Sequence, residues 1–169
     1  LLAKKSPNRR ANRFLGFLLF SFSMSITHFL FVRTGAYHEF PDLLQTSFPF
    51  LFLFGPLFYF YVLLLTDRTH ILRWRDLLHG LPFLIFILAR LPFYTLPHAE
   101  KLAYLASIDK GEVGTSELVV SFVQILQLSC YLVAAHLVLR AYENRIRTVR
   151  SSIEQITLRL LQTGILMFV

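Results

Sequence analysis

The sequence predicts an all-α integral membrane protein, a polytopic bundle of helices, and three observations support this fold class. Of the 169 residues, 55% are hydrophobic and 16% are charged, whereas soluble domains average about 25% charged residues. The hydrophobic residues gather in stretches of bilayer-crossing length, about 20 residues each. These stretches are continuously apolar rather than alternating, which favours helices over the strands of a membrane barrel. The composition also excludes a disordered chain and disfavours a soluble single domain.

Four complete transmembrane helices are predicted, each flanked by charged side chains. They cover residues 14–32, 43–66, 77–97 and 118–139. The third contains Arg90 and the other three contain no charged residue. Residues 1–3 are interpreted as the end of a preceding apolar segment, and residues 160–169 as the start of a further span. We therefore expect the chain to be a fragment with partial spans at both ends.

The basic residues are divided unequally between the predicted loops. The segments before residue 14, from 67 to 76 and after 139 carry 13 Lys and Arg, whereas the two alternate loops carry 3. Loops rich in Lys and Arg stay in the cytoplasm, so the basic loops are predicted to be cytoplasmic. The same rule explains the net charge of +7, which is therefore no indication that this chain binds nucleic acid.

Prolines and a polar connector interrupt the apolar pattern. Pro49 and Pro56 fall within the second span, and the Gly55–Pro56 pair is the predicted kink. Residues 140–159 form the main cytoplasmic connector. Two interpretations of it remain open: a capping box at 151–154 that starts a new helix, or an apolar heptad seam over 139–160 that continues one long helix.

Polar side chains inside the spans define the candidate sensing pocket. Ionisable residues within a membrane are expensive to bury and are functional candidates by default. Ser121, Gln124, Gln127 and Tyr131 form a polar stripe on the fourth span. Such a stripe most often bonds neighbouring helices, and a ligand pocket is the alternative. His28, Arg90 and the stripe lie at similar predicted depth in the outer half of the bilayer. The candidate pocket residues are Arg90, His28, Gln124, Gln127 and Tyr131. A second, inner pair is His79 with His136.

The sequence contains no motif of catalysis, cofactor binding or metal binding. Phosphate-binding glycine loops, a nucleophile elbow and paired zinc-ligand histidines are absent from the sequence. The single cysteine, Cys130, excludes an intramolecular disulfide and a multi-cysteine metal site. We therefore expect no enzyme activity, no cofactor and no metal.

Four local segments together resemble one protein family. They are residues 12–16 (NRFLG), 40–43 (FPDL), 54–62 (FGPLFYFYV) and 76–83 (DLLHGLPF). In order and spacing they resemble the membrane-embedded N-terminal sensor region of bacterial AraC-type transcription regulators, over residues 4–160. That family joins a multi-span sensor to a cytoplasmic helix-turn-helix pair, so the resemblance implies a bacterial inner-membrane protein and a bundle of seven spans.

The resemblance implies a membrane-embedded signal-sensing part of a transcription regulator. DNA would be bound only through a domain absent from this chain, placed after its C-terminus. Regulators of this DNA-binding type often act on paired half-sites, which favours a homodimer, and the signal would be a small molecule or an envelope stimulus. The alternatives are the sensor domain of a histidine kinase or nucleotide cyclase, and, ranked third, a small transporter.

Overall fold

The computed structural model describes residues 8–112, 114–146, 161, 163 and 164, in which the regular elements are helices joined by turns and no strand occurs. The α-helices are α1 (Arg9–Thr34), α2 (Ala36–Glu39), α3 (Leu51–Thr66), α4 (Leu81–Tyr94), α5 (His98–Asp109) and α6 (Thr115–Ile146). The 3-10 helices are η1 (Pro41–Leu43), η2 (Phe48–Phe50) and η3 (Trp74–Gly80). The all-α fold class is therefore confirmed for this part of the chain.

Four helical segments are long and apolar enough to cross a membrane. They are Arg9–Thr34, Pro41–Thr66, Trp74–Tyr94 and Thr115–Ile146, and each contains most of one span expected from the sequence. The first begins before residue 14 and the last continues past residue 139. Residues 147–160 lie outside the described part of the chain, so the two interpretations of the connector and the extent of a further span remain predictions.

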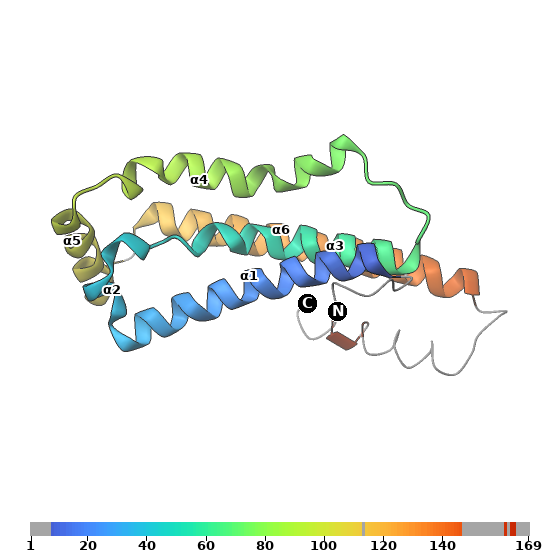
Figure 1. Cartoon of the computed structure of the whole chain (residues 1–169), viewed down its shortest axis with the longest axis horizontal. Helices are drawn as coiled ribbons and strands as arrows, with labels where there is room; N and C mark the ends of the chain where they lie inside the picture. The colour runs from blue at the N-terminus through green and yellow to red at the C-terminus, as the bar shows by residue number, and fades with distance from the viewer. Residues whose placement is uncertain (1–7, 113, 147–160, 162, 165–169) are drawn as a thin grey trace.

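Helix α3 occupies the centre of the bundle, with α1 and α6 packed against it (Figure 1). Aromatic rings make much of the contact with α1, as in the pair Phe22–Phe54, whose centroids lie 4.3 Å apart. On the α6 side, the fully buried cluster contains Val62, Ala135 and Leu139. Large apolar side chains thus hold these three helices together along their length.

The two ends of the bundle differ in composition. The ends of α3 and α6 and the start of α1 meet at one end (Figure 1). Most of the described basic residues belong to these segments, including Arg13, Arg68 and Arg145. We call this the basic end. At the opposite end, α5 packs against α2 and η1. A second buried cluster of Tyr37, Leu44 and Leu105 forms the core there, and we call this the capped end.

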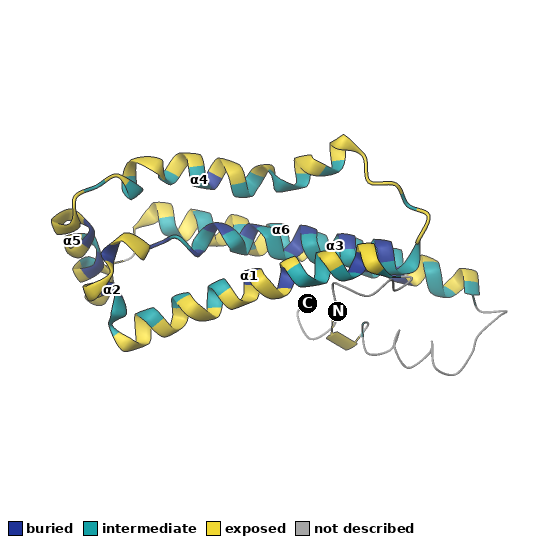
Figure 2. Cartoon of the chain, in the orientation of Figure 1, coloured by how far each residue is buried: buried dark blue, intermediate teal, exposed yellow. Residues whose placement is uncertain are grey.

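The outer faces of the long helices are apolar and exposed (Figure 2). On α4 only Phe86 is buried, whereas Ile85 and Leu88 are 61% and 63% exposed. Exposed apolar surface on this scale would promote aggregation in water. It is suited to contact with lipid or with further membrane helices, which agrees with the membrane class expected from the composition.

The second span is interrupted earlier than the sequence predicts. Helix α3 runs unbroken through Pro56, and the interruption lies between η1 and η2 at residues 44–47. Gln45 adopts a left-handed backbone conformation with φ of 62°, which is uncommon for a residue other than glycine. Pro49 stands at the start of η2, where its missing N–H costs nothing. The chain therefore turns at the capped end before α3 begins.

Side chains of α6 bond two backbone carbonyls of the second span, one of which is freed by Pro56. Pro56 has no N–H, so the carbonyl of Phe52 loses its helical partner. The Gln127 amide donates to that oxygen at 3.1 Å, and the Gln124 amide donates to the carbonyl of Phe48 at 3.5 Å. In an apolar surrounding, an unpaired carbonyl is costly. Both glutamines therefore stabilise the packing of α6 on the broken second span.

Candidate functional site: a cavity at the capped end

A cavity of about 270 Å³ lies at the capped end. Its walls come from the C-terminal part of α1, from α2, from the turn before α3, from α5 and from the start of α6. Apolar side chains including Phe31, Leu44 and Leu105 form one part of the lining, and polar side chains from the turn and from α6 form the other. Apolar walls with a few placed polar groups are typical of small-molecule sites.

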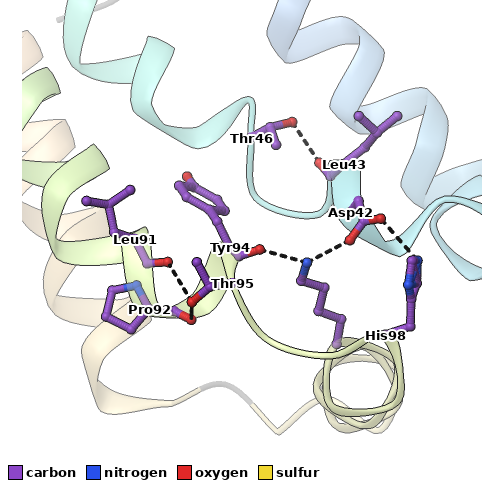
Figure 3. A network of polar contacts seen from close by, with 9 residues as sticks. Asp42, Leu43, Thr46, Leu91, Pro92, Tyr94, Thr95 and His98 are labelled. Carbon is purple, nitrogen blue, oxygen red and sulfur yellow. Dashed lines mark hydrogen bonds and ion pairs between the residues drawn. The ribbon is translucent and has the colours of Figure 1, made fainter.

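Helix α5, which closes this end, is fixed by a buried lysine. The Lys101 side chain is 4% exposed, and its ammonium donates to Asp42 Oδ1 at 2.7 Å and to the Tyr94 carbonyl at 2.9 Å. Asp42 also contacts His98 at 3.0 Å through its other oxygen (Figure 3). This network joins η1, the end of α4 and α5, so three separate segments hold the roof of the cavity.

A chain of polar contacts runs from α4 into the cavity wall. Arg90 pairs with Glu117 at 3.5 Å, and the Tyr104 hydroxyl donates to the same carboxylate oxygen at 3.2 Å. The Gln45 amide donates to the Tyr104 oxygen, and the Tyr94 hydroxyl donates to the Gln45 backbone carbonyl at 3.3 Å. Four elements therefore meet through one hydrogen-bonded network.

The order of donors in this network fixes the orientation of the Gln45 amide. Glu117 is paired with a guanidinium and only accepts, so the single Tyr104 proton points to Glu117. Burial raises the pKa of Tyr104, and the neighbouring Glu117 carboxylate raises it further, so the hydroxyl keeps its proton. The Tyr104 oxygen must then accept from Gln45 Nε2, which leaves Oε1 on the other side of the amide.

Gln45 consequently presents an unmet acceptor. The residue is 4% exposed and lines the cavity, and its Oε1 has no hydrogen-bond partner among the residues that the structure describes. An unsatisfied buried polar atom costs about 1–3 kcal/mol. Combined with the left-handed backbone of the same residue, this is a strained polar group of the kind that clusters at binding sites.

The structure separates the five candidate pocket residues predicted from sequence. His28 lines the cavity and its Nδ1 lies 2.6 Å from the Tyr37 hydroxyl. Arg90 lies behind the wall, in contact with Glu117. Gln124 and Gln127 bond backbone carbonyls of the second span. Their part in sensing remains a prediction.

Tyr131, the fifth candidate, contacts His79. Its hydroxyl lies 2.5 Å from His79 Nδ1, and its ring packs against Tyr59. The predicted inner partner of His79 was His136, whose Nδ1 is buried and has no hydrogen-bond partner within the described residues. Tyr131 therefore belongs to an aromatic cluster with η3 and α3.

Several cavity residues were not identified from the sequence. Gln45 falls in a predicted continuous span, and Tyr104 falls in a predicted outer loop that is in fact α5. Lys101, which holds α5 in place without lining the cavity, falls in the same predicted loop. One indication was available for Gln45, because an amide side chain in an otherwise apolar span needs a hydrogen-bond partner. Nothing in the linear sequence indicated that α5 would fold back over that amide.

The charge of the cavity lining is unbalanced. The described residues that line it include Asp109, Glu112 and Glu117 and no Lys or Arg. Asp109 lies 3.5 Å from His38, and both side chains are largely exposed. Within the described part of the chain, no group of three His, Cys, Asp or Glu is arranged to hold a metal ion. The arrangement is chemically suited to an organic ligand that donates hydrogen bonds.

Comparison with known proteins adds no family assignment. No protein-family model matches the chain, and no curated protein or solved structure is significantly similar to it.

Proposed function

We propose that this chain is the membrane-embedded, signal-sensing part of a bacterial transcription regulator, and that the cavity at the capped end receives the signal. The observation that carries the proposal is the cavity itself, with its strained and unpaired Gln45. The resemblance of the four sequence segments to AraC-type membrane regulators supports transcription regulation as the output of the sensor. The DNA-binding domain would follow Val169, and the rest of a seven-span bundle would lie partly before Leu1 and partly after Val169.

Helix α6 provides a direct physical route for the output. It is a single helix from Thr115 to Ile146, so it begins beside the cavity residue Glu117 and ends among the basic residues Arg140 and Arg145. A packed helix moves as a unit, by small translations or rotations. A ligand that displaces Glu117 would therefore shift the start of the connector at the basic end. The distribution of Lys and Arg predicts that this end is cytoplasmic.

The coding frame beyond Val169 tests this proposal. We expect further apolar spans, followed by a basic soluble segment with two helix-turn-helix patterns. A stop codon soon after the next span would contradict a regulator. A phosphoacceptor histidine region with an ATP-binding domain, or a cyclase domain, would also contradict transcriptional output and assign the same sensor to the alternative effectors.

A further inference from the structure

We infer that the face between α1 and α3 binds an anionic phospholipid of the leaflet at the basic end. The phosphate of the lipid lies on Arg10 and Arg13, and one acyl chain lies in an apolar groove that begins at Arg13. Three observations support this: the length of the groove, two arginines without a carboxylate partner at its end, and the charge that a protein occupant would bring. The inference concerns the membrane contact of the bundle and is independent of any effector after Val169.

The first observation is the length of the groove between α1 and α3. Its volume is about 890 Å³, and on α1 its lining runs from Arg13 to Ser21, which is about 12 Å along the helix axis. One leaflet is about 15 Å deep, half of the hydrocarbon core. The groove therefore has the length of an acyl chain in a single leaflet, whereas a further helix crosses both leaflets and needs a longer contact.

The walls of the groove are apolar. Phe17 and Phe20 of α1 line one side and are 63% and 54% exposed. Phe50, Leu53 and Leu57 line the other side, and the Phe20 and Phe50 ring centroids lie 5.7 Å apart. Lipid hydrocarbon is as apolar as these side chains, so the groove holds a chain by close packing alone. Selection of one lipid over another must therefore come from the headgroup.

The second observation is the pair of arginines at the end of the groove. Arg13 lines both the groove and a second hollow of about 300 Å³, which it shares with Arg10, Ile71 and Leu72. Within the described part of the chain, neither arginine forms an ion pair with a carboxylate, and Arg10 Nη1 donates to the His70 carbonyl at 3.4 Å. Guanidinium groups bind phosphate oxygens through charge-assisted hydrogen bonds. The second hollow is therefore suited to a phosphate headgroup.

Helical spacing places the charged and apolar parts of this site on the same face of α1. Arg10, Arg13, Phe17 and Phe20 follow one another at intervals of three, four and three residues, which keeps them on one side of a helix. A phospholipid has the same order of parts, with its charge at the membrane surface and its hydrocarbon below. One molecule can therefore contact both arginines and the groove.

The third observation is the charge of the possible protein occupants. A second copy of the chain has the same orientation in the membrane, so its basic end would meet this basic end at the same depth. The segments 1–7 and 147–160 of the chain are also basic, with five Lys and Arg against one acid, Glu154. The cytoplasmic leaflet carries anionic lipids, and the distribution of Lys and Arg predicts that the basic end lies there. Charge complementarity therefore favours a lipid over a further helix.

The test is native mass spectrometry of the purified full-length protein released from nanodiscs. The nanodiscs contain equal amounts of dioleoyl phosphatidylglycerol and dioleoyl phosphatidylcholine, which have identical chains and differ in net charge. We expect phosphatidylglycerol to be retained about tenfold more than phosphatidylcholine, because each arginine near the surface favours an anionic lipid. Equal retention of the two lipids would overturn the inference. Glycerophosphoglycerol, the headgroup without chains, is expected not to displace the lipid, and displacement would identify a site for free anions instead.

A pair of arginine variants locates the headgroup. Arg13→Gln removes the cation that the two spaces share, and we expect it to lower the preference for phosphatidylglycerol about fivefold. The side chain is exposed, so the substitution removes no core packing. Arg145→Gln removes the same charge from an exposed position on α6 and is expected to leave the preference unchanged. Equal effects of the two substitutions would show unspecific attraction to the basic end and overturn the assigned site.

A pair of phenylalanine variants locates the acyl chain. Phe17→Ala removes a wall of the groove and is expected to reduce the retention of lipid severalfold. Phe122→Ala removes a ring on α6 that is 66% exposed, against 63% for Phe17, and is expected to have no effect. Equal retention by both variants would contradict a chain in the groove. The same spectra report the oligomeric state, and a dimer that dissociates in the Phe17→Ala variant without loss of lipid would assign the groove to a second copy.

Discussion

Replacing Gly55 with alanine is expected to destabilise the protein by about 1–3 kcal/mol, the usual cost of overpacking a close contact. A Cβ atom at this position would lie 2.7 Å from Tyr131 Cδ2 and 2.9 Å from Tyr131 Cβ. The second atom is fixed to the α6 backbone, so side-chain rotation cannot relieve the clash. Helices α3 and α6 would have to separate, which loosens the Val62–Ala135–Leu139 cluster.

Gly80→Ala is the matched control for this prediction, because a Cβ there meets nothing within 4 Å. Thermal unfolding of both variants in the same detergent, followed by circular dichroism, measures the difference. A Gly55→Ala variant as stable as Gly80→Ala would contradict the packing of α6 on α3.

Replacing Asp42 with alanine is expected to destabilise the docking of α5, because it removes the carboxylate partner of a buried ammonium. The substitution leaves the Lys101 side chain buried at 4% exposure, with the Tyr94 carbonyl still accepting from its ammonium. The Asp42 side chain is 62% exposed, so water reaches one side of the ion pair and reduces the destabilisation caused by the substitution. We expect α5 to detach from η1 before the long helices unfold.

Hydrogen–deuterium exchange of residues 98–109 detects this local opening. Glu39→Ala removes another exposed carboxylate at the same end and is expected to leave α5 protected. Unchanged protection in the Asp42→Ala variant would show that Lys101 does not hold α5 in place.

The spans could be predicted from the sequence because hydropathy over about 20 residues is a local property. The position of the break in the second span could not be predicted in this way. Gly55 and Pro56 indicated a kink, but α3 tolerates Pro56 because Gln127 bonds the carbonyl that it frees. The freed carbonyl follows from the sequence, whereas its partner depends on the register between α3 and α6, which no local pattern specifies.

The cavity could be predicted only in part, for a similar reason. His28 was selected as an ionisable group within a span, and it lines the cavity. Gln45 and Tyr104 come from segments 59 residues apart, and their contact depends on the docking of α5, to which the Lys101–Asp42 pair and the Tyr37–Leu44–Leu105 cluster contribute. The polar stripe predicted on the fourth span has two roles in α6. Ser121 lines the cavity, whereas Gln124 and Gln127 donate hydrogen bonds to backbone carbonyls of the second span.

The central claim is that the cavity opens on the outer side of the membrane. Cysteine labelling in bacterial spheroplasts measures this orientation. In a Cys130→Ser background, Lys110→Cys marks the capped end and Arg68→Cys marks the basic end, and both positions are exposed. A membrane-impermeant maleimide is predicted to label the Lys110→Cys variant in intact spheroplasts and the Arg68→Cys variant only after lysis. Labelling of the Arg68→Cys variant before lysis, with the Lys110→Cys variant protected, would place the cavity in the cytoplasm and contradict an outward-facing sensor.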